Sequence, residues 1–380
     1  MSKVVLSNVI ETIESGSRPK GGKRDSGIPS IGAGELNDNG GFTFTKLGYV
    51  PEKYFKDLKR GVIKEFDVIV VKDGATTGKT SYVDSNFPFN LSAVNEHVFI
   101  LRGIKEKILP KYLFYFLYSP IGFDSIMTDF RGATVGGISQ KFIDKIEIPL
   151  PSLEEQKAIV AKLDRAQRLI DIDKAMLEKY DQLIQSVFLD MFGDPKTNSK
   201  KIKVGKLGDF AFINMGQSPR GSSYNENGEG EPLLNGPTEF GEKYPQEKQW
   251  TTEPKKFAEV DDILFCVRGA TAGRTNLSDK KYCIGRGLAA IRGEDKLDTT
   301  FIHFVLKSHY DYFQNQGQGS TFINIAKKDL SNLEVPIPTK ELQYEFISAS
   351  KLIENQKQVT KVSLKKSEEL FSSLVQEVFE

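Results

Sequence analysis

The chain is poor in the residues that form disulfide bonds or bind metals. Its 380 residues include only two cysteines, three histidines and one tryptophan. Two cysteines are too few for a disulfide framework, and Cys266 and Cys283 lack the CxxC spacing of a zinc site. His97, His303 and His309 show no metal-ligand pattern. We therefore expect no metal in this chain, and we expect both cysteines to be buried in strands.

Long apolar runs and excess charge are also missing. No stretch of about 18 apolar residues occurs, and the first residues lack the apolar core of a signal peptide. We expect a soluble, cytoplasmic protein that does not enter a membrane. The formal net charge is +1, from 52 Lys and Arg against 51 Asp and Glu. A uniformly basic surface is thereby excluded, although basic side chains can still gather on one face.

Recognisable catalytic motifs are absent. The sequence has no GxSxG nucleophile motif and no Asn-Pro-Pro-aromatic motif of adenine methyltransferases, and its carboxylates are scattered. We predict that this chain is not an enzyme by itself.

A heptad pattern near the middle of the chain is the clearest feature that is present. No Pro or Gly interrupts residues 152–192, Ser152 and Glu155 form a capping box, and GDP at 193–195 supplies a stop. The pattern predicts one helix of about 40 residues, roughly 60 Å long, which needs a partner along its length. The predicted contact positions, interrupted only by Asp173, are Ile159, Leu163, Ala166, Ile170, Leu177, Tyr180, Ile184, Val187 and Met191.

The order of motifs in the first half recurs in the second. Residues 66–80 return as 261–275, residues 146–151 return as 333–338, and Glu154 and Gln156 return as Glu341 and Gln343. The last pair opens a second long helix, predicted at 340–379 and antiparallel to the first. Its apolar stripe is less regular: Leu342, Phe346, Ile353, Leu370 and Leu374 share it with Gln356, Thr360, Ser363 and Ser367.

Short apolar and β-branched runs between polar, glycine-rich loops predict strands at 68–71, 98–101, 263–267 and 288–291, and a short helix is expected at 112–118 and 301–307. The fold class is therefore α+β. Two similar mixed α/β domains, 1–151 and 195–338, are joined by two long antiparallel helices, 152–194 and 339–380. The helices form a coiled-coil bar with approximate two-fold symmetry.

Each copy contains a strand that ends in a glycine-rich turn, at 74–80 and 269–275. The first turn resembles a nucleotide-binding P-loop, but three residues separate its glycines where four are required, and Arg274 stands at the lysine position of the second copy. We therefore expect no nucleotide site. Two interpretations stay open: the backbone N–H groups and flanking basic side chains bind nucleic-acid phosphates, or the glycines only permit a hairpin turn.

Polar and basic side chains of these turns and of nearby loops can bind phosphates or base edges, and several occur in both copies. The candidates of the first copy are Arg18, Lys20, Lys23, Arg24, Lys72, Thr76, Thr77, Lys79, Arg131, Thr134, Gln140 and Lys141. Those of the second copy are Arg220, Ser222, Ser223, Tyr224, Arg268, Thr271, Arg274, Gln318, Ser320, Thr321, Asn324, Lys327 and Lys328.

These motifs resemble the specificity subunit of type I restriction-modification systems over the whole chain. The resemblance lies in the junction PLPSLEEQ at 149–156, the helix end DMFGDP at 190–195, and the turns DGATTGKT at 73–80 and RGATAGRT at 268–275. The second junction, PIPTKELQ at 336–343, is a looser version of the first.

The resemblance implies a non-catalytic subunit that recognises double-stranded DNA. Two target recognition domains would each read half of a bipartite site, and the helices would set the spacer. It implies two methyltransferase subunits, which bring S-adenosylmethionine and dock on the helices, and restriction subunits, which use ATP and Mg²⁺. This chain would carry no cofactor. Two alternatives remain: a non-catalytic scaffold whose coiled coil and domains bind only proteins, and a nucleotide-dependent enzyme with phosphate at the Gly74 turn.

Overall fold

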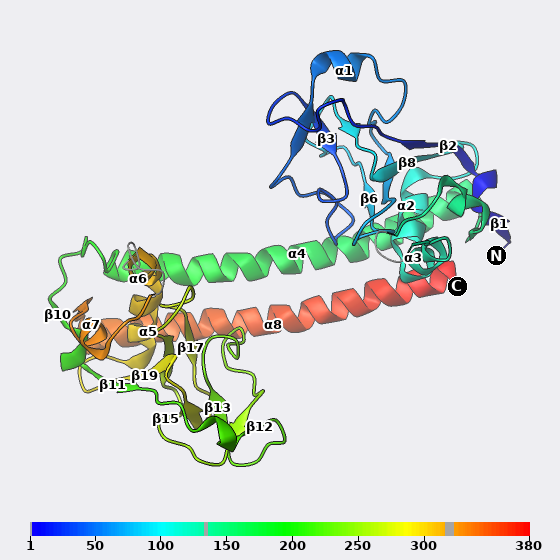
Figure 1. The fold of residues 1–380 in the computed structure, drawn as a ribbon. Coiled ribbons are helices and arrows are strands. Elements are labelled where there is room, and N and C mark those ends of the chain that lie inside the picture. Colours follow the sequence, from blue (N-terminus) through cyan, green and yellow to red (C-terminus); the bar gives the residue numbers. More distant parts are fainter. Residues whose placement is uncertain (1, 133–135, 316–322) are drawn as a thin grey trace. The chain divides into compact units, whose positions relative to one another are not determined.

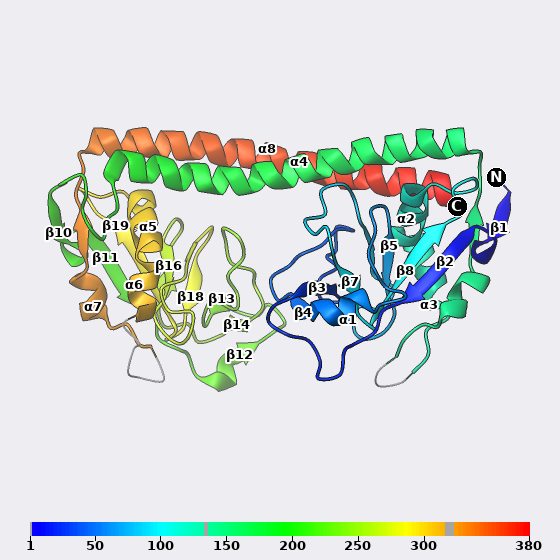
Figure 2. The same ribbon diagram turned by 90° about the horizontal axis from the view of Figure 1, so that it is seen from above.

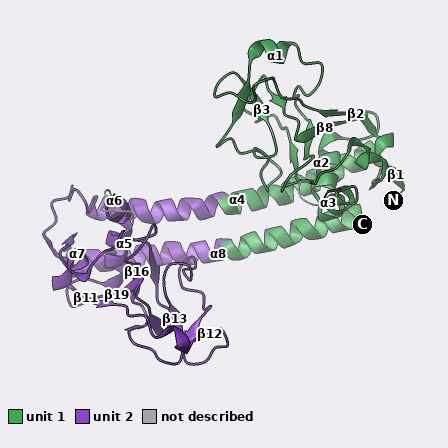
Figure 3. Ribbon diagram, in the orientation of Figure 1, with its two compact units in different colours: residues 1–174, 361–380 green, residues 175–360 purple. Residues whose placement is uncertain are grey.

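The computed structural model describes all residues except 1, 133–135 and 316–322 (Figure 1). The chain divides into two compact units, one of residues 1–174 with 361–380 and the other of residues 175–360 (Figure 3). Each unit thus contains part of both long helices. The four segments predicted from the sequence treat the two domains and the two long helices as separate parts. Their boundaries remain a prediction. Among the described helices, none is long and apolar enough to span a membrane.

The first unit is built on a four-stranded antiparallel sheet in the order β2-β8-β5-β6 (Figure 2). A second sheet has the order β4-β3-β7, and β1 pairs with β9. The strands are β1 Lys3–Val5, β2 Ile10–Ser15, β3 Ile28–Ile31, β4 Gly48–Val50, β5 Val68–Val71, β6 Thr80–Tyr82, β7 Ala93–Val94, β8 Val98–Gly103 and β9 Glu147–Pro149. The short helices are α1 Glu52–Lys56, α2 Pro110–Tyr118 and α3 Pro120–Met127.

The second unit repeats this arrangement. Its main sheet has the order β11-β19-β16-β17, a second sheet has the order β12-β14-β13-β18-β15, and β10 pairs with β20. The strands are β10 Val204–Lys206, β11 Ala211–Met215, β12 Tyr224–Asn225, β13 Glu231–Leu234, β14 Trp250–Thr251, β15 Phe257–Ala258, β16 Ile263–Cys266, β17 Thr275–Leu277, β18 Tyr282–Ile284, β19 Leu288–Gly293 and β20 Glu334–Pro336. The short helices are α5 Thr299–Ser308, α6 Tyr310–Asn315 and α7 Lys327–Ser331. The predicted repeat and all four predicted strands are confirmed.

The strand β5 is apolar throughout because both of its faces are covered. Val68 and Val70 belong to the core that packs on α2, whereas Ile69 and Val71 belong to the core under the second sheet. The strand β16 is divided in the same way between two cores of the second unit. Side chains alternate across a strand, so a continuous apolar run is what a doubly covered strand requires.

The polar, glycine-rich stretches 15–39 and 214–252 are not loops throughout. They contain β3, β12, β13 and β14, and Ile31 of β3 and Leu234 of β13 belong to the cores on the second face of each main sheet. These strands are short and rich in Gly and polar neighbours, so their pattern does not stand out from a loop.

Helix α4 spans Leu153–Phe192, as predicted. The capping box is formed: the backbone N–H of Ser152 donates to Glu155 Oε2 (2.9 Å), and the N–H of Glu155 donates to Ser152 Oγ (3.3 Å). Every predicted contact position is buried or half-buried. Asp173 is also buried there, because it accepts a hydrogen bond from Ser367 Oγ of helix α8.

Helix α8 spans Lys340–Phe379, also as predicted, and it runs antiparallel to α4 within each unit. In the first unit Lys162 pairs with Glu377 and Lys174 with Glu368; in the second, Lys357 pairs with Asp181. The predicted apolar stripe was partly wrong, because Gln356, Ser363 and Leu370 are exposed. Their places in the contact are taken by Lys357, Leu364 and Phe371, which are buried or half-buried.

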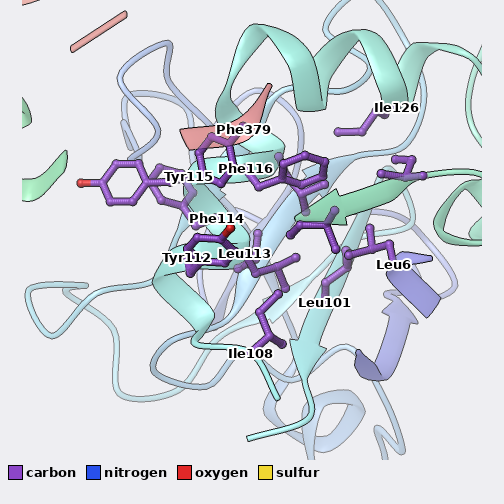
Figure 4. Packing of buried hydrophobic residues seen from close by; sticks show 14 of the residues in the cluster. Leu6, Leu101, Ile108, Tyr112, Leu113, Phe114, Tyr115, Phe116, Ile126 and Phe379 are labelled. Atoms are coloured by element: carbon purple, nitrogen blue, oxygen red, sulfur yellow. The ribbon is translucent and has the colours of Figure 1, made fainter. Parts of the chain in front are cut away.

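The end of α8 completes the core of the first unit. The ring of Phe379 lies 5.3 Å from that of Tyr112 and 5.5 Å from that of Phe116, between centroids (Figure 4). Leu374, Val375 and Val378 belong to the same core. The last residues of the chain therefore stabilise the domain that its first residues form.

The repeated glutamine at the start of each long helix is a buried clamp. Gln156 Oε1 accepts from the N–H of Leu109 (2.8 Å), and its Nε2 donates to the carbonyls of Lys107 (2.9 Å) and Pro151 (3.0 Å). Gln343 makes the same three bonds, to Asp298, Lys296 and Pro338. These bonds tie the start of each long helix to the segment that leads into α2 or α5.

Candidate nucleic-acid interface

The glycine-rich turns join β5 to β6 and β16 to β17. Gly74 and Gly78 have φ values of +98° and +86°, so these positions favour glycine. The turn uses its own N–H groups: those of Thr77 and Gly78 donate to the carbonyls of Gly74 and Val71. The N–H groups of Ala272 and Gly273 are bonded in the same way. These bonded N–H groups are unavailable to phosphate, which favours the hairpin interpretation for the backbone and leaves the side chains as candidates.

Two candidate side chains are turned inward. Thr77 is 5 % exposed and its hydroxyl donates to the carbonyl of Gly74 (2.7 Å). Ser223 is 7 % exposed, and its hydroxyl bonds to the carbonyl of Arg220 (2.7 Å) and lies 2.7 Å from Thr251 Oγ1. Both hydroxyls hold turns together, which gives Thr77 and Ser223 a structural role, and their contact with nucleic acid remains a prediction. This inward direction could not be predicted from the sequence, because an inward hydroxyl and an outward one have the same local pattern.

The structure joins each glycine-rich turn to the loop that follows the short helices. In the first unit the N–H of Gly74 donates to the carbonyl of Gly136 (3.1 Å), and the N–H of Ile138 donates to the carbonyl of Lys72 (2.8 Å). Arg131 pairs with Gly137 beside them. Lys72 and Arg131, far apart in sequence, therefore share one edge, next to the turn that carries Thr76.

The second unit repeats that edge. The N–H of Gly269 donates to the carbonyl of Ile323 (2.9 Å), and the N–H of Ile325 donates to that of Val267 (2.8 Å). Arg268 Nε donates to Asn324 Oδ1 (3.0 Å), so two predicted candidates are in direct contact. Thr271 is half-buried, with its hydroxyl 3.7 Å from Cys266 Sγ.

A polar network in the first unit surrounds the predicted candidates Arg18 and Lys72. Arg18 lies 2.7 Å from Glu96 Oε1 and 3.2 Å from His97 Nε2, and His97 Nδ1 lies 2.5 Å from Asp73 Oδ1. Lys72 Nζ donates to the carbonyl of Glu96 (3.0 Å). Asp73, Glu96 and His97 are not among the predicted candidates, because no local pattern shows that His97 lies between Arg18 and Asp73.

The corresponding place in the second unit has different chemistry. Ser218 stands where the first unit has Arg18, and its Oγ accepts from the N–H of Arg286 (3.1 Å). The N–H of Lys72 donates to the carbonyl of His97, and the N–H of Val267 donates to that of Gly287. Gly287 is therefore equivalent to His97, and Arg268, which follows Val267, is equivalent to Asp73. Two equivalent edges with different donors and acceptors can distinguish different partners.

Asp129 holds the loop that carries Arg131. Its buried carboxylate accepts from the N–H of Ser139 (2.9 Å), the hydroxyl of Ser139 (2.8 Å) and Nζ of Lys145, while Arg131 lies 3.2 Å away. Burial alone would raise the pKa of Asp129, but the bonds from Lys145 and Ser139 outweigh it and lower the pKa well below its usual range. The loop is thus anchored by a charged carboxylate.

Most remaining candidates are exposed, namely Lys20, Lys23, Arg24, Thr76, Gln140, Lys141, Arg220, Ser222, Arg274, Lys327 and Lys328. Lys79 is half-buried and pairs with Asp38 (2.6 Å), and the hydroxyl of Tyr224 donates to the carbonyl of Pro219 (3.4 Å). Thr134, Gln318, Ser320 and Thr321 lie outside the described residues.

Within the described residues, no group of His, Cys, Asp and Glu side chains could hold a metal ion. Cys266 and Cys283 are buried in β16 and β18, as predicted.

An ion pair between an arginine and a buried aspartate, not predicted from the sequence, supports each main sheet. Arg102 Nε donates to Asp67 Oδ1 (2.6 Å), and Arg292 Nε donates to Asp262 Oδ1 (2.6 Å). The two aspartates stand at the same place in the repeat, immediately before β5 and β16. The pairs could have been predicted from the repeated aspartate, together with the arginine that lies near the end of both β8 and β19.

The chain matches the family described as "Type I restriction modification DNA specificity domain" over residues 5–180 and 199–365. A Methanocaldococcus jannaschii protein, named as a candidate type I restriction enzyme MjaX specificity subunit, is 30 % identical over 374 residues, 92 % of this chain and 86 % of the relative. The Salmonella potsdam StySPI specificity subunit is 32 % identical over 162 residues, 43 % of this chain and 34 % of that protein.

Solved structures agree on the fold. A chain from a study of complex assembly and conformational transition of the type I R-M system has a TM-score of 0.64 at 25 % identity, with 99 % of this chain and 97 % of that chain covered. The S subunit of a type I restriction-modification system from M. genitalium has a TM-score of 0.60 at 15 % identity, with 100 % of this chain and 96 % of that chain covered.

Proposed function

This chain belongs to the type I restriction-modification DNA specificity family, and we propose that each of its two units reads one half of a bipartite DNA target. As a specificity subunit it recognises DNA sequence. The observation that carries the finer proposal is the duplicated edge, where a glycine-rich turn and a second loop present polar side chains in both units. The two edges differ in chemistry, so the two half-sites are expected to differ in sequence.

The long helices present surfaces for other subunits of the complex. Four exposed apolar side chains of α4 recur at helical spacing and form one stripe. This stripe lies on a different face of the helix from the contact with α8. They are Leu169, Ile172, Met176 and Leu183, between 39 % and 48 % exposed. Helix α8 carries a similar exposed stripe of Tyr344, Leu352, Val359, Val362 and Leu370. We infer that methyltransferase subunits cover these stripes, since exposed apolar patches of this kind mark protein interfaces.

The chemistry of the complex belongs to its partners. Two methyltransferase subunits would bring S-adenosylmethionine and methylate adenine, and restriction subunits would use ATP and Mg²⁺ to cleave DNA. This chain would contribute recognition alone and carry no cofactor. Since such a complex acts on the DNA of its own cell, the proposal also gives the chain a cytoplasmic location.

The proposal that the partner subunits supply most of the sequence-independent affinity for DNA can be tested by measuring DNA affinity with and without the methyltransferase subunit. The net charge of +1 leaves little sequence-independent attraction in the chain alone. We expect weak binding by the isolated chain and tight, site-specific binding by the complex. Equal affinity in both preparations would contradict the proposal.

A further inference from the structure

A basic segment of the first unit, residues 52–60, has no assigned role. It comprises α1 and the residues that follow it, at one edge of the unit (Figure 1, Figure 2). Its four basic side chains, Lys53, Lys56, Lys59 and Arg60, are all exposed. Within the described part of the chain, none of these four side chains forms an ion pair or a hydrogen bond.

Both ends of the segment are anchored to the end of β2. The hydroxyls of Tyr54 and Ser17 lie 2.5 Å apart, and the N–H of Gly61 donates to Glu14 Oε2 (2.6 Å). Gly61 has a φ of +78°, and a Cβ there would lie 2.9 Å from the Cα of Gly16. Strand β2 therefore fixes the backbone of the basic segment while its charged side chains reach solvent.

The segment adjoins the first group of predicted candidates. Arg24 and Tyr49 exchange two backbone hydrogen bonds of 2.9 and 3.0 Å, which places the loop of residues 18–24 beside the strand that leads into α1. That loop carries Arg18, Lys20, Lys23 and Arg24, all exposed. The two groups of basic side chains therefore lie on neighbouring segments, where they outnumber the exposed acidic residues Asp25, Glu52 and Asp57.

The described residues of the second unit include no such segment at the equivalent place. The N–H of Val94 donates to the carbonyl of Gly61, and the N–H of Ile284 donates to that of Lys256, each at 2.8 Å. Gly61 and Lys256 are thus equivalent, and residues 252–256 are the counterpart of residues 51–61. The counterpart contains Lys255 and Lys256 with Glu253, and it forms no helix.

We propose that residues 52–60 bind the phosphate backbone of DNA on the first unit and position that unit without reading bases. The inference rests on the proposed function. Four unpaired basic side chains on a fixed backbone match a polyanion, and phosphate contacts fix orientation and register rather than sequence. The equivalent segment of the second unit is shorter and forms no helix, so this phosphate contact belongs to the first unit.

The test uses the complex of this chain with its methyltransferase subunits. The affinity of the complex for a DNA duplex that contains its methylation motif is measured from about 50 to 200 mM salt. The variant carries Lys53→Gln, Lys56→Gln, Lys59→Gln and Arg60→Gln. A control variant carries Lys3→Gln and Lys105→Gln, two exposed residues near the opposite end of β2. Genome-wide methylation by each complex is mapped in parallel.

Each lost phosphate contact should reduce the slope of log affinity against log salt by about 0.9. We expect the magnitude of this slope to be smaller by about two to four in the fourfold variant, which should still methylate the same motif. The control variant should keep the wild-type slope. An unchanged slope in the fourfold variant, with specific methylation intact, would overturn this inference alone. Absence of a bipartite motif from the wild-type complex would overturn the proposed function, and this inference with it.

Discussion

Two glutamines that are equivalent in the repeat, Gln156 and Gln343, show how one residue can connect two elements. Each accepts one backbone N–H and donates to two backbone carbonyls, and neither is exposed. Their repetition was visible in the sequence, but the partners were not, because Lys107 and Leu109 lie almost 50 residues away from Gln156. A repeated polar residue at a helix start can indicate a buried clamp as readily as a surface contact.

Removing one clamp should be costly. Gln156→Ala leaves a buried N–H and two carbonyls without their partner, at about 1–3 kcal/mol for each group that water cannot reach. We expect a loss of at least about 2 kcal/mol in the free energy of unfolding, measured by urea denaturation. Gln185→Ala, at an exposed position of the same helix, should change it by less than about 0.5 kcal/mol. Equal effects of both changes would contradict the clamp.

His303 should make the second unit sensitive to acid. Burial, helped by Lys307 and Lys243, lowers the pKa of His303 from its ordinary value near 6.5 to about 3. The unfolded chain takes up this proton near pH 6.5 while the folded chain stays neutral, so the stabilisation present above pH 6.5 is lost as the pH falls towards 3. The ring Nε2 lies 3.0 Å from Thr275 Oγ1.

The measurement compares the free energy of unfolding at pH 7.5 and pH 5. His303→Gln keeps a group that can bond to Thr275 but does not titrate. The variant should lose less stability between the two pH values than the wild-type protein loses. An identical loss in both proteins would show that another group is responsible.

At the scale of single elements, helix α4 could be predicted in full and helix α8 only in its extent. The contact positions of α4 keep a heptad of apolar residues, so periodicity identifies them. In α8 the contact includes Lys357, whose Nζ lies 2.6 Å from Asp181 and 3.2 Å from Glu242. A lysine that buries its aliphatic stem and pairs its charge is invisible to a hydrophobicity pattern.

The exposed stripe of α4 should be required for assembly. Leu183→Asp places a charge in the proposed contact with a methyltransferase subunit, and an unpaired buried charge is costly at an interface. We expect at least a tenfold loss of affinity for that subunit, measured by calorimetry. Gln185→Asp, on another face of the same helix, is the matched control and should bind normally. Normal binding by both variants would place the interface elsewhere.

At the scale of the whole molecule, the repeat predicted the architecture, because two copies of one motif order imply two copies of one fold. The candidate site was less predictable. Backbone bonds between residues 72 and 138, or 267 and 325, create the shared edges. No local pattern reports such a pairing. The inward direction of Ser223 has a similar cause, since its hydroxyl lies 2.7 Å from that of Thr251, which is distant in sequence.

The length of the helices should set the spacer between half-sites. Inserting one heptad into α4 after Lys174 and a matching heptad into α8 after Thr360 keeps both contact patterns and adds roughly 10 Å. We expect the spacer of the methylated motif to change by roughly three base pairs while both half-sites stay the same, since base pairs rise by about 3.4 Å. A changed half-site with an unchanged spacer would contradict this role.

The central claim is that the two units each read half of one DNA target. It is tested most directly by producing the chain with its methyltransferase subunit in a host that lacks adenine methylation, and by mapping methylated adenines with long-read sequencing. The account predicts a single bipartite motif with a spacer of constant length. An active complex that leaves no bipartite motif above background would contradict it.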